Sequence, residues 1–144
     1  MCLLPQQVII EQTYAAPVNT VWQALTKKEQ MQQWYFTLSD FEPKVGFEFS
    51  FEGINEDRSY LHHCTITAVV PNQLLSHTWR YQGYEGDSLV TWELFKEKDG
   101  TRVRLTHSGL ETFPENPDFS KEQFVTGWTE ITGSLLRVFV ERDL

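Results

Sequence analysis

The side chains best suited to acid–base chemistry or metal binding near neutral pH are four histidines, His62, His63, His77 and His107. His62 and His63 are adjacent, so in a strand their side chains point to opposite faces and cannot bind one metal ion together. His77 and His107 fall in two different predicted strands. The spacing of the histidines therefore predicts no metal site.

Strand parity gives two of these histidines a candidate role. His77 shares a face with Trp79, and His107 shares a face with Leu105, so both are predicted to point into an apolar interior. A neutral imidazole there could hydrogen-bond a ligand or act as a base. The competing interpretation is a pair of core histidines that are satisfied by protein groups. Both interpretations stay open at this point.

Other catalytic patterns are not present in the sequence. The segment HSG (107–109) lacks the GxSxG turn and an evident acidic partner, so it predicts no serine nucleophile. Glu48, Glu52 and Glu93 alternate with apolar residues, which is typical of a solvated sheet face rather than a desolvated acid–base pair. Neither a P-loop nor a GxGxxG is found. We therefore assign no catalytic residue and no cofactor.

Composition indicates one domain over residues 1–144, because 40% hydrophobic and 14% aromatic residues in 144 positions suffice for a single core. The formal net charge of −8 excludes a phosphate backbone as a natural partner and disfavours anionic membranes. No apolar run approaches the ~20 residues that span a bilayer. The expected partner is therefore neither nucleic acid nor membrane.

The first residues and the cysteines indicate a cytoplasmic protein. The segment MCLLPQQ lacks the basic region and long apolar stretch of a secretory signal. Cys2 and Cys64 are too few for a disulfide framework and show no CxxC spacing, so both are expected to be reduced thiols.

The elements that position these residues follow from periodicity. A strand is predicted at 6–14, then a short helix starting near Pro17 and a second short helix that ends near Trp34, with Thr26 and Glu29 as its capping box. Period-two alternation separated by turns predicts antiparallel strands at 45–52, 59–70, 73–82, 87–97 and 101–109. A further strand at 36–42 would make seven.

The segment 120–142 is predicted to be one long helix, capped by Ser120 and Gln123. Its apolar stripe consists of Trp128, Ile131, Leu135 and Phe139. Such a helix must cover the apolar face of the sheet, and a curved sheet leaves a pocket beneath it.

Two glycines interrupt this helix, although each costs roughly 1 kcal/mol relative to alanine. Helical geometry places Gly127 close to the Ile131 row, so it is predicted to face the sheet or a ligand. Gly133 is predicted to lie at the outer edge of the stripe.

Motifs along the whole chain resemble a known superfamily. They are YAAPV…VWQALT (14–26), Trp34, PN…L…TW (71–79), VTWEL (90–94), GTRVRLTHSG (100–109) and GW (127–128). Together they are similar to the SRPBCC superfamily, in the branch named for the C-terminal domain of the activator of Hsp90 ATPase. The resemblance implies an α+β helix-grip (Bet v 1-like) fold, in which a curved antiparallel sheet of about six or seven strands wraps around a long C-terminal helix and encloses a hydrophobic cavity. Members include ligand carriers, cyclases, hydroxylase subunits and co-chaperone domains.

Three classes of function follow from this reading. The first is a domain that binds a small apolar or amphipathic molecule, the second is an enzyme of cyclase, dehydratase or hydrolase type that uses cavity polar residues, and the third is an interaction domain with an Hsp90-type chaperone as candidate partner. The expected state is a monomer or homodimer. The candidate cavity residues are Tyr14, Phe49, Trp79, Trp92, His77, His107, Phe124, Trp128, Ile131 and Leu135.

Overall fold

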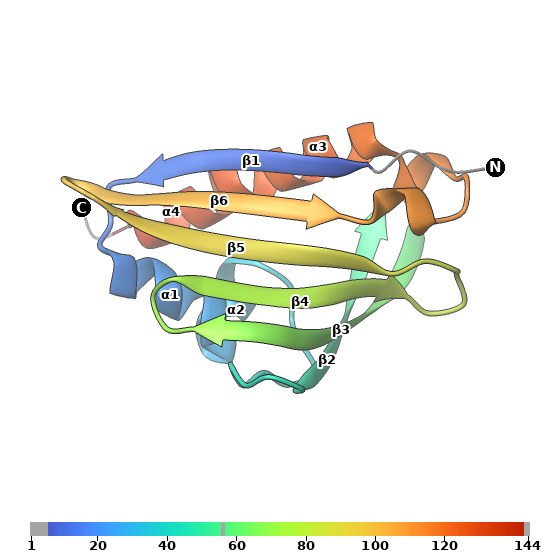
Figure 1. The fold of residues 1–144 in the computed structure, drawn as a ribbon, viewed down its shortest axis with the longest axis horizontal. Helices are drawn as coiled ribbons and strands as arrows, with labels where there is room; N and C mark the ends of the chain where they lie inside the picture. The colour runs from blue at the N-terminus through green and yellow to red at the C-terminus, as the bar shows by residue number, and fades with distance from the viewer. Residues whose placement is uncertain (1–5, 56, 143–144) are drawn as a thin grey trace.

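Residues 6–55 and 57–142 are described by the computed structural model, and their centre is a six-stranded antiparallel sheet (Figure 1). The strands lie in the order β1-β6-β5-β4-β3-β2 across the sheet. Their bounds are β1 Gln7–Tyr14, β2 Glu48–Asn55, β3 Arg58–Val70, β4 Leu74–Tyr81, β5 Ser88–Glu97 and β6 Gly100–Ser108. The predicted strands are confirmed, with ends shifted by up to three residues.

One face of the sheet is dry, and buried residues alternate with more exposed ones along β5 and β6. In β5, Val90, Trp92 and Leu94 are buried, while the residues between them are partly exposed. Trp92 is paired with Leu75 of β4 and with Leu105 of β6, so large apolar side chains lie side by side on the concave face. The core lies between this face and the helices.

Two short helices follow β1, α1 (Val18–Thr26) and α2 (Lys28–Trp34). The predicted capping box at the start of α2 is wrong. The Thr26 hydroxyl donates to the carbonyl of Trp22 at 2.7 Å, and Lys27 takes the capping position without a side-chain hydrogen bond. The threonine is thus used by the end of α1 rather than by the start of α2.

The predicted strand at 36–42 is also wrong. These residues, all within the described chain, are irregular, although Leu38 and Phe41 are buried. The rings of Phe36 and Phe41 contact Phe51 and Phe49 of β2, but one backbone hydrogen bond joins these residues to β2, from the amide of Ser39 to the carbonyl of Ser50 at 2.9 Å. A single contact of this kind does not build a ladder.

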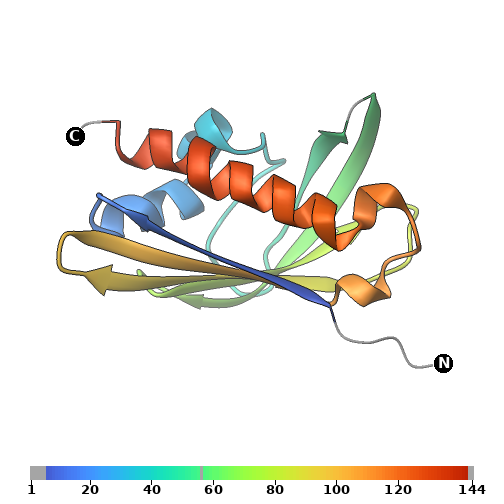
Figure 2. The same ribbon diagram turned by 90° about the horizontal axis from the view of Figure 1, so that it is seen from above.

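The C-terminal helix crosses the concave face of the sheet (Figure 2). It begins with α3 (Lys121–Glu130), widens into a π-helical segment (Ile131–Leu136) and ends with α4 (Arg137–Val140). Ser120 caps it as predicted, because its hydroxyl accepts from the amide of Gln123 at 3.3 Å. The helix-grip architecture is therefore confirmed. None of the helices in the described part of the chain has the length and apolar character needed to cross a membrane.

The π-helical segment changes which side of the helix is buried. A π-turn holds one residue more than an α-turn, so the buried face moves one position along the chain. Leu136 is fully buried, whereas Leu135 is 42% exposed. The placement of Leu135 in the cavity is therefore wrong, because it assumed an unbroken α-helical period.

Two side chains, one from β1 and one from the helix itself, donate hydrogen bonds to carbonyls of the widened turn. The Tyr14 hydroxyl, at the end of β1, donates to the carbonyl of Thr132 at 2.6 Å. Arg137 donates from Nε to the carbonyl of Gly133 at 3.3 Å and from a second guanidinium nitrogen to the carbonyl of Thr13 at 2.9 Å. The widened part of the helix is thus hydrogen-bonded directly to β1.

Candidate ligand-binding pocket

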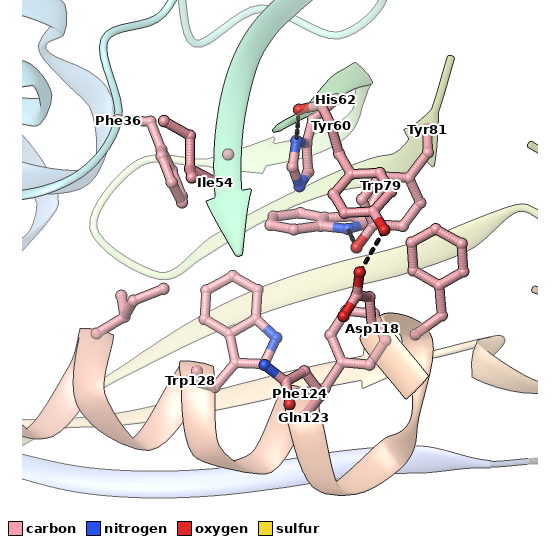
Figure 3. Close-up of a pocket in the computed structure, with 14 residues that line it drawn as sticks. Phe36, Ile54, Tyr60, His62, Trp79, Tyr81, Asp118, Gln123, Phe124 and Trp128 are labelled. Carbon is pink, nitrogen blue, oxygen red and sulfur yellow. Dashed lines mark hydrogen bonds between the residues drawn. The ribbon is translucent and has the colours of Figure 1, made fainter. Parts of the chain in front are cut away.

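A pocket of about 190 Å³ lies between α3 and the end of the sheet formed by β2, β3 and β4 (Figure 3). A register shift between Ile66 and Ala68 interrupts the pairing of β3 with β4, and such bulges bend and twist a strand. The β2–β3 hairpin rises beside the helix in Figure 2, and residues of both line the pocket, so that the hairpin and the helix form two of its walls.

Phenylalanine, tyrosine and tryptophan rings supply half of the lining residues. They belong to Phe36, Tyr60, Trp79, Tyr81, Phe119, Phe124 and Trp128. Trp79 and Trp128 meet in the wall with ring centroids 5.3 Å apart. Trp79 donates its indole N–H to the Tyr81 hydroxyl at 2.9 Å, so the ring offers an apolar face to the pocket.

An ion pair stands at one side of the pocket. Arg58 donates to both carboxylate oxygens of Asp118, at 2.6 and 2.8 Å, and the Tyr60 hydroxyl donates to the same carboxylate. The Asp118 side chain is only 7% exposed, and Asn116 fixes its backbone by accepting from the Asp118 amide at 2.9 Å. The hydrogen bond to Asp118 raises the pKa of Tyr60. The guanidinium of Arg58 balances the charge of the Asp118 carboxylate without any ligand.

His62 is the other buried polar side chain of the lining, and its ring stacks on Phe51 with centroids 4.5 Å apart. Its Nδ1 lies 2.9 Å from the carbonyl of Tyr60. Burial lowers the pKa of His62 to about 4, so the ring is neutral at pH 7. Gly53 on β2 leaves room for this ring, because a Cβ there would lie 2.6 Å from Cε1 of His62.

His107 lies in the core behind the pocket, fully buried. Ser88 donates to the carbonyl of Trp79 at 2.7 Å, so its oxygen accepts from Nε2–H of His107 at 2.8 Å. Nδ1 of His107 accepts from the indole N–H of Trp128 at 3.0 Å. Burial lowers the pKa of His107 to about 3. Both ring nitrogens are therefore used inside the protein, as the core interpretation requires.

His77 is likewise a core residue. Its Nδ1 lies 2.9 Å from the carbonyl of Thr78, and its ring meets Phe49 edge to face at 5.2 Å. Burial lowers the pKa of His77 to about 4. It borders a small internal void together with Phe49 and Trp92, away from the pocket beside α3.

Four of the ten residues predicted for the cavity meet in this pocket, namely Trp79, Phe124, Trp128 and Ile131. Tyr14, Phe49, Trp92, His77 and His107 lie in the core instead, and Leu135 faces outward.

Sequence reasoning missed most of the pocket's polar side. His62 shares strand parity with buried Tyr60 and Cys64, so parity within β3 would have found it. Asp118 and Phe36 lie outside the strands and the long helix, where no periodic signal exists.

Of the two glycines of the C-terminal helix, Gly127 lies on the pocket side that was predicted for it, and Gly133 does not lie where it was predicted. Gly127 lines the pocket, and a Cβ there would meet nothing within 4 Å. A Cβ on Gly133 would lie 3.2 Å from Nε2 of Gln12 on β1. Gly133 is therefore the close contact with the sheet, and its predicted place at the outer edge is wrong. The π-helical segment, which contains Gly133, is the reason.

The curved antiparallel sheet around a C-terminal helix defines a helix-grip, Bet v 1-like domain. The chain belongs to the SRPBCC-type family described as Activator of Hsp90 ATPase homolog 1-like protein, which matches residues 15–140. This confirms the resemblance seen in the sequence. No curated protein matches the chain.

Solved structures share the fold. Protein MLL2253 from Mesorhizobium loti is 27% identical with a TM-score of 0.78, over 95% of this chain and 98% of its own. CalU16 from Micromonospora echinospora is 26% identical with a TM-score of 0.73, over 94% and 76%. Protein CV1439 from Chromobacterium violaceum is 18% identical with a TM-score of 0.81, over 94% and 96%, which shows the fold alone.

Proposed function

We propose that this domain binds a small, neutral, largely apolar molecule in the pocket between α3 and the β2–β3 hairpin. The observation that carries the proposal is the aromatic lining of a space of about 190 Å³ that the protein's own side chains do not fill. Concave, mainly apolar sites with a few placed polar groups are typical of small-molecule binding. The family membership supports the same class of function.

The charge arrangement favours a neutral ligand. Asp118 is held by the guanidinium of Arg58 and by the Tyr60 hydroxyl, so a cationic ligand would compete with an ion pair that already exists. An anionic ligand would meet this carboxylate at the pocket wall. Neither a cationic nor an anionic ligand would therefore gain a buried ion pair in this pocket.

The surroundings of His77 and His107, the two candidate bases predicted from the sequence, also favour binding over base catalysis. His107 uses both ring nitrogens on Ser88 and Trp128, so it has no lone pair for a substrate proton. His77 lies outside the lining of the pocket. The chaperone-partner alternative would need a contiguous apolar surface. Of the large apolar side chains exposed in the described chain, Val125, Leu135 and Val138 lie on the C-terminal helix, and the others are spread over several strands and loops.

The test is a substitution on α3 whose side chain fills the pocket. Leucine at Gly127 extends into the pocket from a position where a Cβ meets no neighbour, so Gly127→Leu should fold and lose binding of para-ethylphenol in calorimetric titration. Thr126→Leu adds similar bulk at an exposed neighbouring position and should bind as the wild type does.

Native mass spectrometry of the freshly purified chain should in addition detect a copurified small molecule that the Gly127→Leu variant lacks. Equal affinity of both variants for para-ethylphenol, with no bound molecule in the wild type, would refute the proposed function.

A further inference from the structure

The pocket contains an unused hydrogen-bond acceptor in its buried wall, at Nε2 of His62. The carbonyl of Tyr60 can only accept, so the 2.9 Å contact requires the hydrogen to be on Nδ1. In a neutral imidazole the other nitrogen then carries a lone pair. Figure 3 shows this second nitrogen on the side of the ring away from the Tyr60 carbonyl.

No hydrogen bond from a described residue reaches Nε2, although His62 as a whole is only 5% exposed. Its neighbours are rings: Phe51 stacks on one side, and Trp79 and Tyr81 stand edge-on at centroid distances of 4.7 Å each. His62 lines the pocket, so this nitrogen can accept a hydrogen bond from a ligand that enters it.

A donor is available on a neighbouring ring, because the ring centroids of Tyr81 and His62 are 4.7 Å apart. The Tyr81 hydroxyl accepts from the indole N–H of Trp79 at 2.9 Å, so its own hydrogen remains available, and among the described residues none accepts it. Burial raises the pKa of Tyr81, which keeps this hydroxyl protonated. Tyr81 and His62 both line the pocket.

We infer that the pocket selects a ligand with a hydroxyl group at its buried end, such as a phenol or a small cyclic alcohol, whose hydroxyl donates to Nε2 of His62 and accepts from Tyr81. A hydroxyl group fits because it donates and accepts at one atom. An ether or ketone supplies only the acceptor, and a hydrocarbon supplies neither. The inference rests on the proposed function, because it names the class of molecule for the same pocket.

The position of His62 is itself built into the hairpin. Gly53 lies opposite Tyr60 in the β2–β3 register, next to the Phe51–His62 pair, and a side chain at Gly53 would displace the imidazole. Gly53 is thus a positioning residue for the acceptor. Replacing it with alanine moves the ring without removing it.

The experiment compares two probes of nearly equal shape, para-ethylphenol and para-ethyltoluene, in which a methyl group replaces the hydroxyl. The wild type should bind the phenol about tenfold more tightly, as expected for one good hydrogen bond in a buried site. His62→Phe keeps an aromatic ring but removes the acceptor, so the two affinities should become equal while that for para-ethyltoluene is retained. His62→Gln keeps an acceptor and should restore part of the preference.

His63→Phe is the matched control, because His63 is exposed and adjacent strand residues face apart. It should leave the tenfold preference unchanged. Nitrogen NMR of His62 should also show a shift of Nε2 with the phenol and none with the toluene. Equal binding of both probes by the wild type would overturn the inference and leave the proposed function standing. Failure to bind either probe would overturn both.

Discussion

At the level of single residues, the buried histidines are the most informative feature. His62, His77 and His107 are each less than 6% exposed, and each ring is fixed by at least one hydrogen bond to protein. Burial lowers the pKa of these rings to about 4, about 4 and about 3, against an ordinary value of 6.5. The dry core therefore holds three imidazoles in their neutral form.

Acid should destabilise the fold through these rings. Below pH 6.5 these histidines bind protons in the unfolded chain but not in the folded chain, because burial lowers their pKa. Folding stability is therefore full above pH 6.5 and is lost as the pH falls towards the pKa values of the folded state, near 4. Each histidine should remove about 2 kcal/mol between about pH 6.5 and pH 5. Urea unfolding at both pH values measures this, and His62→Gln should reduce the loss by about a third. A flat profile would contradict the prediction.

At the level of elements, one of the hydrogen bonds between β1 and the widened helix is expected to have a large effect on stability. The Tyr14 hydroxyl is buried and donates to the carbonyl of Thr132 at 2.6 Å. Tyr14→Phe leaves that carbonyl without this donor and should lower the free energy of unfolding by about 1 to 3 kcal/mol. Tyr84→Phe, at a 43% exposed position, is the control and should change stability by no more than about 0.5 kcal/mol. Equal urea midpoints for the two variants would show that this bond is not stabilising.

The two glycines of the same helix should respond differently to alanine. Gly127→Ala gains about 1 kcal/mol of helix propensity, because its methyl group meets open space. Gly133→Ala has the same gain, but its methyl group would press on Gln12, whose amide oxygen accepts from Arg137 at 3.1 Å. Thermal melts should therefore rank Gly127→Ala above Gly133→Ala. Titration should show weaker para-ethylphenol binding only for Gly127→Ala, and the reverse ranking would contradict this placement.

The same elements show how far sequence alone reaches. Alternation in 88–97 or 100–108 depends on adjacent residues only, so the strands were predictable within a few positions. The change of period at Ile131–Leu136 depends on tertiary contacts such as that of Tyr14, and the sequence pattern shows no break there. Asp118 and Phe36 line the pocket from segments outside the strands and the long helix, and no periodic pattern in the sequence indicates the path of these segments. Four of the ten candidate residues line the pocket because long helix and strand patterns placed them.

At the level of the whole molecule, the pocket results from unequal contact between one straight helix and one curved sheet. Near β1 the helix is bonded to Tyr14, Thr13 and Gln12. Near the β2–β3 hairpin, aromatic side chains line the space between hairpin and helix, and Arg58 of β3 pairs with Asp118 in the segment before α3. The closed end provides stability, and the open end provides the space.

The fold should not survive without its C-terminal helix. A chain that ends at residue 119 loses the burial of Phe124, Trp128, Leu136, Phe139 and Val140. Each such side chain is worth roughly 1.5 to 3 kcal/mol, and together they match a typical total stability of about 5 to 15 kcal/mol. Circular dichroism should show no cooperative melt for this fragment. A sharp transition with native sheet content would refute the expectation.

The π-helical segment also affects how this chain is compared with its relatives. An α-helical turn in its place would need one residue fewer, so a relative without the widening would carry a single-residue deletion within 131–136. An alignment that slides this gap into a neighbouring loop would match Leu135 to the wrong partner and rotate all of α4 by about 100° relative to the sheet. The helix interior, rather than a loop, is then the natural place for an insertion or deletion at this end of the chain.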